Sequence, residues 1–311
     1  MNIHFFWRFT NLSSCRVIGG GGAGRIFAQN FFSMEKVWLI TGCSRGIGRV
    51  LVEEVLDKGG KVIATARDIL SIQDLVEPDR CVAMRLDVND IDSIPAVIQS
   101  AWGIWGRIDV VVNNAGYGLL GAIEELSMAQ VRAQMETNFF GLLAVTQAVT
   151  PYLRQQGSGW IVNVSSMAGL RGMASLGAYN ASKFAVEGLT EALHGELAPF
   201  GIRVSAIEPG PYRTDWAGPS LDRSEAINQE TSDSPYHALN MTQKAAFEGR
   251  SGKQPGDPRQ IASVLVEAAE APSVPMHMVF GDIAIAGYQD RLRNMEAPAF
   301  ARFFPHDQFH F

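Results

Sequence analysis

The sequence predicts an α/β protein in which one doubly wound, seven-stranded parallel sheet is flanked by helices on both faces. From Met34 onward, short β-rich runs alternate with helix-like segments, as in sheets with crossover helices. Several of the strand-like runs are almost wholly apolar, which is expected of strands covered on both faces. No repeat or linker divides the pattern, so a single domain over 34–311 is predicted.

Each element follows from its local composition. The seven predicted strands are Lys36–Thr41, Lys61–Thr65, Cys81–Leu86, Ile108–Asn113, Trp160–Ser165, Ile202–Glu208 and Met276–Phe280. Helices are expected to begin near Gly46, Asp90, Met128, Ala178 and Pro258. The stretch Asp215–Gln254 is polar, contains Gly and Pro, and is weakly periodic, so it is interpreted as an insertion over a binding site.

Composition excludes several classes of protein. Of the 311 residues, 47% are hydrophobic and 19% charged, which is ordinary for a soluble globular protein. The net charge of −6 argues against a sequence-independent nucleic-acid binder. There is no uninterrupted apolar run of about 18 residues, so no membrane span is expected. The three cysteines form no CxxC pair, so we predict no metal site and expect reduced thiols in a cytoplasmic protein.

The first 33 residues do not match the rest of the chain. They contain Arg8, Arg16 and Arg25 but no Asp or Glu, together with a run of four glycines. We favour a wrongly assigned start upstream of Met34. A basic, acid-poor transit peptide and a disordered extension are the alternatives.

A glycine-rich loop joins the first predicted strand to the first helix. It reads Thr41-Gly42-Cys43-Ser44-Arg45-Gly46-Ile47-Gly48. Glycines at this turn let the backbone approach a pyrophosphate, and the helix N-terminus points at its negative charge. An ordinary strand-to-helix turn is the alternative, but three glycines in the first such turn favour a Rossmann-type dinucleotide site at Gly42, Ser44, Arg45, Gly46, Ile47 and Gly48.

Tyr179 and Lys183 are four residues apart, so on a helix they are neighbours on one face. A free tyrosine has a pKa near 10 and is a poor base at neutral pH. A cation about 4 Å away, at an effective dielectric of about 20, contributes roughly 4 kcal/mol, or about three pKa units. This pair therefore predicts a general acid/base. A surface Tyr and Lys on an amphipathic helix is the alternative for such a pair alone.

These motifs together resemble the short-chain dehydrogenase/reductase family over Lys36 to Phe280. The spacing TGxxxGxG is typical of that family. Its other motifs follow in order as Asn113-Asn114-Ala115-Gly116, Asn138, Ser166, Tyr179-Asn180-Ala181-Ser182-Lys183 and Pro209-Gly210. The longer C-terminal half resembles the steroid/retinol dehydrogenase-like branch and unassigned bacterial oxidoreductases.

The resemblance implies a catalytic set of Asn138, Ser166, Tyr179 and Lys183. Ser166 would hydrogen-bond the substrate oxygen, Tyr179 would transfer the proton, and Asn138 would order a water that relays protons to Lys183. Ser165 is expected to point to the other face and make a structural hydrogen bond. Further cofactor contacts implied by the resemblance are Asp87, Val88, Asn114, Ala115, Gly116, Tyr179, Lys183, Pro209, Gly210 and Thr214.

The end of the second strand predicts the choice of cofactor. An NAD site needs a carboxylate there for the ribose, whereas NADP needs a cation for the 2′-phosphate. Ala66 stands where NAD-preferring relatives carry the acid, Arg67 follows it, and Arg45 is a second cation. We therefore expect NADP(H), with NAD(H) possible if Asp68 serves the ribose instead.

The predicted substrate pocket is apolar or aromatic. The positions expected to face it, beside Ser166 and Tyr179, are Tyr117, Leu119, Met167, Leu170, Met173, Leu176, Tyr212 and Trp216. No cation is obviously aimed at an acidic group of the substrate, so a lipophilic alcohol, ketone or aldehyde fits best.

A regulator or scaffold that binds NADP(H) without turnover is the alternative function.

The chain also lacks the Asp-Gly-Gly that often closes the fold in this family. This puts the common tetramer in doubt and leaves a homodimer possible.

Overall fold

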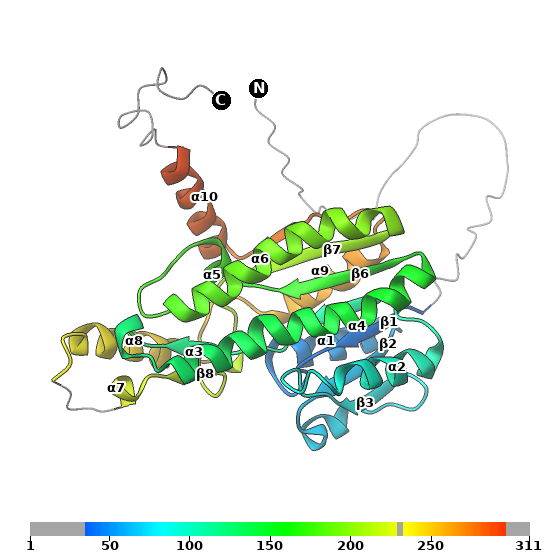
Figure 1. Ribbon diagram of the computed structural model, residues 1–311, viewed down its shortest axis with the longest axis horizontal. Coiled ribbons are helices and arrows are strands. Elements are labelled where there is room, and N and C mark those ends of the chain that lie inside the picture. Colours follow the sequence, from blue (N-terminus) through cyan, green and yellow to red (C-terminus); the bar gives the residue numbers. More distant parts are fainter. Residues whose placement is uncertain (1–34, 229–232, 297–311) are drawn as a thin grey trace, which may run out of the picture. The chain divides into compact units, whose positions relative to one another are not determined.

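The computed structural model describes residues 35–228 and 233–296, so the three interpretations of residues 1–33 lie outside the described part. Seven strands form one parallel sheet in the order β3-β2-β1-β4-β6-β7-β9 (Figure 1). The strands are β1 (Val37–Ile40), β2 (Lys61–Ala66), β3 (Cys81–Arg85), β4 (Val110–Asn113), β6 (Gly159–Val164), β7 (Ile202–Pro209) and β9 (His277–Phe280). The predicted doubly wound, seven-stranded sheet is confirmed.

The strand order reverses between β1 and β4. Trp38 of β1 pairs with Val62 of β2 on one side and with Val110 of β4 on the other. The connections that leave these two strands therefore diverge at their carboxyl ends, where open α/β sheets bind ligands.

Two helical layers cover the sheet. On one face, α1 (Gly46–Asp57) and α9 (Pro258–Glu270) pack against a core that includes Trp38 and Ile40. On the other, α2 (Ile94–Trp105), α4 (Gly141–Gln156) and α6 (Gly177–Leu197) pack against a core that includes Val37 and Leu39. Alternate residues of β1 thus enter opposite cores, which explains why the whole strand is apolar.

Two predicted helices differ in detail from those observed. The helix expected near Asp90 begins at Ile94, because Asp90 and Ser93 form a turn in which the Ser93 hydroxyl bonds the Asp90 carbonyl at 2.9 Å. The helix expected from Met128 comprises α3 (Met128–Met135), a π-turn η3 (Glu136–Phe140) and then α4.

The region around the predicted insertion contains structure that the sequence pattern did not indicate. Strand β8 (Leu221–Arg223) pairs in parallel with β5 (Gly118–Leu120), forming a second, two-stranded sheet. With α7 (Glu225–Asn228) and α8 (His237–Arg250), β8 lies at the end of the main sheet toward which the strands run (Figure 1). The remaining elements are η1 (Ile69–Leu75), η2 (Ile123–Glu125), α5 (Met167–Leu170), η4 (Ala198–Phe200), η5 (Asp215–Ala217) and α10 (Asp282–Glu296).

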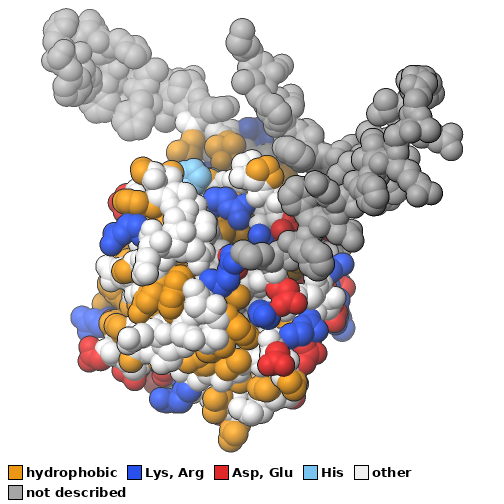
Figure 2. Space-filling model, turned by 90° about the vertical axis from the view of Figure 1, so that its right-hand side faces the viewer, with side chains coloured by type: hydrophobic (Ala, Val, Ile, Leu, Met, Phe, Trp, Pro, Cys, Tyr) orange, Lys and Arg blue, Asp and Glu red, His pale blue; other side chains and the backbone are white. Residues whose placement is uncertain are grey.

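The surface fits the composition of the chain. Basic and acidic side chains intermix with apolar ones on the face seen in Figure 2. Among the described residues, no helix is both long and apolar enough to cross a membrane.

Candidate active site

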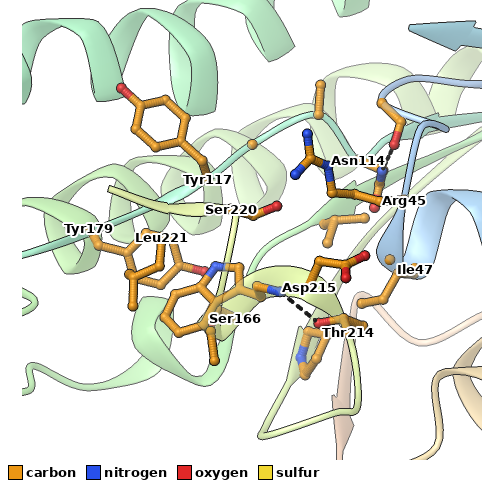
Figure 3. A pocket seen from close by; sticks show the side chains of 18 of the residues that line it. Arg45, Ile47, Asn114, Tyr117, Ser166, Tyr179, Thr214, Asp215, Ser220 and Leu221 are labelled. Carbon is orange, nitrogen blue, oxygen red and sulfur yellow. Dashed lines mark hydrogen bonds between the residues drawn. The ribbon is translucent and has the colours of Figure 1, made fainter. Parts of the chain in front are cut away.

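A cavity of about 810 Å³ opens beyond the carboxyl ends of the strands (Figure 3). Most residues predicted to bind cofactor or substrate line it. They are Gly42, Ser44, Arg45, Gly46, Ile47, Arg67, Asp87, Val88, Asn114, Ala115, Gly116, Ser166, Met173, Tyr179, Lys183, Pro209, Gly210, Tyr212 and Thr214. Gly48 and Asn138 do not line the cavity but lie behind this wall.

The glycine loop has the geometry of an anion cradle. Gly42 and Gly46 have φ of +70° and +60°, a region that favours glycine. Within the described residues, the N-cap Arg45 makes no side-chain hydrogen bond to the first turn of α1, and that turn contains no acidic residue. Its N–H groups and helix dipole therefore remain available to a phosphate.

Asn114 holds this loop against the end of β4. Its Nδ2 donates to the carbonyls of Thr41 and Gly42 at 2.8 and 3.0 Å. The Thr41 hydroxyl in turn accepts from the N–H groups of Asn114 and Ala115 at 2.9 and 3.0 Å. A Cβ on Gly48 would lie 2.4 Å from Asn114 Nδ2, so only glycine fits there. The two motifs therefore form one rigid unit.

Tyr179 lies on the first turn of α6, fully buried beside Ser166. The side chains of Ser166 and Trp216 lie beside its phenol, and the Tyr179 and Trp216 rings are 5.2 Å apart. Burial raises the Tyr179 pKa to about 12, while the polar groups of the Ser166 and Trp216 side chains oppose the rise. Ser166 lies two residues beyond β6 and caps α5 by accepting from the Ala168 N–H at 3.1 Å, which fixes its hydroxyl.

Lys183 is one helical turn beyond Tyr179. Its Nζ donates to the Val164 carbonyl at 2.7 Å and is 5.9 Å from the centre of the Tyr179 ring. Burial lowers the Lys183 pKa to about 8, and the charge of Glu187 opposes this. The predicted lowering of the Tyr179 pKa by this lysine was wrong for this arrangement, because desolvation outweighs a cation directed at a carbonyl.

Asn138 occupies the π-turn η3 and is fully buried. Its Oδ1 accepts from the Tyr117 N–H at 3.0 Å, and its Nδ2 donates to the Tyr117 carbonyl and the Ser182 hydroxyl. A Cβ on Gly116 would lie 3.0 Å from Asn138 Oδ1 and 3.6 Å from Lys183 Nζ. The asparagine and the lysine therefore face the same backbone segment.

The residues after β2 separate into a cavity side and a solvent side. Arg67 lines the cavity, as does Arg45, which in Figure 3 lies on the same side as Ile47 and Asp215. Asp68 instead caps η1, its Oδ1 accepting from the Leu70 N–H at 3.0 Å. Among the described residues, no ion pair engages Arg45 or Arg67.

Several expectations about the pocket were wrong. Leu119 and Leu170 do not line the cavity, because Leu119 packs with Leu126 and Ala178 in a small separate core. Ser165 is buried and lines the cavity, but its hydroxyl has no hydrogen-bond partner in the described part of the chain, contrary to the structural bond predicted.

Sequence reasoning also missed lining residues. Arg171 and Arg250 line the cavity, although no cation was expected on the substrate side. Asp222 and Phe247, from β8 and α8, line it as well. Their placement depends on how distant segments fold over the site, for which the sequence carries no local signal.

A partly buried charged cluster adjoins Lys183 on helix α6. His277 Nδ1 lies 2.8 Å from Glu208 Oε1 and 3.4 Å from Glu187 Oε2, and Glu187 follows Lys183 by one turn of α6. These contacts raise the His277 pKa to about 10, while burial raises that of Glu208 to about 7. The cluster ties α6, β7 and β9 together.

A glycine-rich loop at the switch point of a doubly wound sheet, sharing one cavity with Ser166, Tyr179 and Lys183, defines a dinucleotide-binding protein equipped for proton transfer. The family model for short chain dehydrogenase matches residues 36–224. The chain therefore belongs to the short-chain dehydrogenase/reductase family of oxidoreductases, as the sequence motifs predicted.

Known proteins similar to this chain come from distant organisms. An oxidoreductase of Botryotinia fuckeliana is 38% identical over 81% of this chain and 91% of its own length. Human retinol dehydrogenase 8 is 40% identical over 59% of this chain and 61% of its own. A short-chain dehydrogenase of Streptomyces avermitilis superimposes with a TM-score of 0.77 at 36% identity, covering 85% of this chain and 94% of that one.

Proposed function

We propose that this protein is an NADP(H)-dependent oxidoreductase that interconverts a lipophilic alcohol with its ketone or aldehyde. The observation that carries this proposal is that Ser166 and Tyr179 line the same cavity as the glycine loop, with the Ser166 side chain beside the Tyr179 phenol. A dinucleotide on that loop and a carbonyl oxygen at Ser166 would share one enclosed space.

The chain's own residues supply orientation and the proton. Ser166 would bind the substrate oxygen, and Tyr179 would donate its proton to that oxygen during reduction or accept one during oxidation. The nicotinamide ring would supply or accept the hydride at C4. Lys183, one turn away and with its pKa lowered to about 8, would exchange protons with the site, and Asn138 would position a water that relays them.

Preference for NADP(H) is supported by two cations with no ion-pair partner among the described residues, Arg45 and Arg67, and by the engagement of Asp68 in capping η1. NAD(H) remains the second candidate. A 3-ketoacyl-(acyl-carrier-protein) reductase of Brucella melitensis, 25% identical with a TM-score of 0.64, has been solved with NADH.

The apolar walls support a lipophilic substrate. They include Met167, Met173, Leu176, Trp216, Leu221 and Phe247. Two similar proteins carry names that point the same way: human retinol dehydrogenase 8, and a 3-ketodihydrosphingosine reductase of Bacteroides thetaiotaomicron that is 32% identical over 80% of this chain and 88% of its own.

A regulator without turnover is disfavoured because Asn138, Ser166, Tyr179 and Lys183 are all present and adjacent.

We also propose a cytoplasmic location, supported by the unpaired, buried thiols of Cys43 and Cys81.

The test is a panel of carbonyls and alcohols assayed with NADPH and NADP by absorbance of the reduced nicotinamide. Tyr179→Phe should lower turnover at least about a hundredfold and leave cofactor affinity nearly unchanged, because only the proton donor is lost. Tyr152→Phe is the matched control, since Tyr152 packs against Trp102 and does not line the cavity. Near-normal turnover in a folded Tyr179→Phe protein would overturn the proposal.

A further inference from the structure

The cavity wall continues onto helix α10, where it meets the side chain of Arg171. Ile283, in the first turn of α10, lines the cavity, and Gly287 follows four residues later on the same face. A Cβ on Gly287 would lie 3.1 Å from Arg171 Nε and 3.2 Å from its Cζ. The guanidinium of Arg171 therefore packs against α10, one turn beyond the point where the helix meets the cavity.

The charge of Arg171 is not compensated within the described residues. Its Nε is buried and has no hydrogen-bond partner there, and no carboxylate forms an ion pair with its guanidinium. Burying a guanidinium N–H without a partner is unfavourable, so this position is suited to an acceptor from outside the chain.

A second arginine stands beside the first. Arg291 of α10 donates to the carbonyl of Leu170, the residue before Arg171. Its guanidinium also lies over the Phe184 ring, 4.7 Å from the centroid. In the described part of the chain it has no carboxylate partner either, whereas Arg293 in the same helix pairs with Asp290. Two positive charges without a carboxylate partner among the described residues thus lie near each other: Arg171, just after α5, lines the cavity, and Arg291 of α10 bonds the residue before it without lining the cavity.

We propose that Arg171, assisted by Arg291, binds an oxyanion at the far end of the substrate, so that the substrate is an anionic amphiphile. This inference rests on the proposed function, because the apolar walls would hold the lipophilic body while Ser166 and Tyr179 hold the reacting oxygen. A planar guanidinium fork suits both a carboxylate and a phosphate. Asp215 and Asp222 also line the cavity, but among the described residues neither forms an ion pair with Arg171 or Arg291.

Equilibrium binding tests the inference without requiring turnover. A medium-chain fatty acid, its methyl ester and an alkyl phosphate of equal length are titrated while tryptophan fluorescence is followed, since Trp216 lines the cavity. The fatty acid should bind about ten- to hundredfold more tightly than the ester, the range expected for a hydrogen bond to a charged group. The alkyl phosphate distinguishes a carboxylate from a phosphate as the preferred head group.

Variants assign the preference to the arginine. In Arg171→Met the acid-to-ester ratio should fall to about one with ester affinity unchanged, which also reports an intact pocket. Arg171→Lys should retain part of the ratio, because it keeps the charge but loses the planar fork. Arg132→Met removes an exposed arginine of α3 that does not line the cavity and should behave as the unmodified protein.

Two outcomes would overturn the inference: equal affinity for acid and ester in the unmodified protein, or a preference that survives Arg171→Met. Failure of the proposed function is distinguished by a different result, namely that no aldehyde, ketone or alcohol is turned over although the fatty acid binds. An ω-oxo fatty acid and its ester, assayed with NADPH, should show the same Arg171-dependent ratio in kcat/KM.

Discussion

At the scale of single residues, desolvation sets the protonation state of the candidate site. Burial raises the pKa of Tyr179 to about 12 and lowers that of Lys183 to about 8. The phenol is therefore protonated at neutral pH, which is the state needed to donate a proton to a carbonyl. A lysine near its own pKa can also release or accept a proton at modest cost.

Cofactor choice also depends on single residues. NADPH should bind at least tenfold more tightly than NADH, because Arg67 and Arg45 line the cavity and a charged hydrogen bond contributes about 1.5–3 kcal/mol. The pair Ala66→Asp with Arg67→Leu should reverse the order, since a carboxylate repels the 2′-phosphate and accepts from a free ribose hydroxyl. Fluorescence titration of both cofactors measures this.

A control and a contrary result define that experiment. Arg49→Ala is the matched control for Arg45→Ala, because Arg49 pairs with Glu53 and Asp74 and does not line the main cavity. Arg45→Ala should weaken the binding of NADPH and leave the binding of NADH little affected. Equal affinities for the two cofactors in the unmodified protein would show that neither Arg45 nor Arg67 contacts a phosphate.

At the scale of elements, the start of α1 depends on close backbone approach. A Cβ at Gly48 would meet Asn114 Nδ2 at 2.4 Å and the Gly42 carbonyl at 2.7 Å. Gly48→Ala should therefore destabilise the protein by about 1–3 kcal/mol, the usual effect of overpacking, and should weaken cofactor binding. Thermal unfolding and cofactor titration report the two effects.

Gly103 provides the opposite case. It lies exposed in α2, and among the described residues no atom lies within 4 Å of where its Cβ would be. Gly103→Ala should stabilise the protein by about 0.5–1 kcal/mol, because alanine loses less backbone entropy in a helix. If Gly48→Ala raised the melting temperature as Gly103→Ala does, the Gly48 position would be governed by helix propensity and not by the close contact with Asn114.

Elements differed in how far the sequence could predict them. The seven strands of the main sheet are apolar and β-branched, so their existence was predictable from local pattern alone. Strands β5 and β8 are three residues each and pair across about a hundred positions, so they had no local signal. The resemblance singled out Asn138, but the π-turn that buries it depends on packing against Ser182 and Tyr117. The contacts of Arg171 with α10, and of His277 on β9 with Glu208 on β7, arise only when distant segments pack together, so the local sequence could not predict them.

At the scale of the whole molecule, the Glu187–Glu208–His277 cluster couples stability to pH. The His277 pKa is raised from 6.5 to about 10 by its two glutamates. The stabilisation from its positive charge is therefore fully present below about pH 6.5 and is lost as the pH rises through about 10.

His277→Gln should remove this contribution. The difference in melting temperature between the unmodified protein and this variant should be largest near pH 6.5 and shrink toward pH 10. Taking the difference cancels the opposite trend expected from Lys183, whose lowered pKa favours the folded state at high pH. A difference in melting temperature that stays constant from pH 6.5 to pH 10 would show that the histidine is not charged in the folded protein.

The reversal of strand order at β1 also determines how the chain reaches its native state. Strands β1 to β3 can pair soon after synthesis, but the other edge of β1 stays unpaired until β4 is made. The partners of β1 in β4 lie about seventy positions later in the chain, as Val111 does for Leu39. Closing such long loops before any contact is gained makes folding slow, and an unpaired apolar edge can join another chain. We expect refolding to be slow and its yield to fall as protein concentration rises, because the central strand that carries the cofactor loop is the one left open longest.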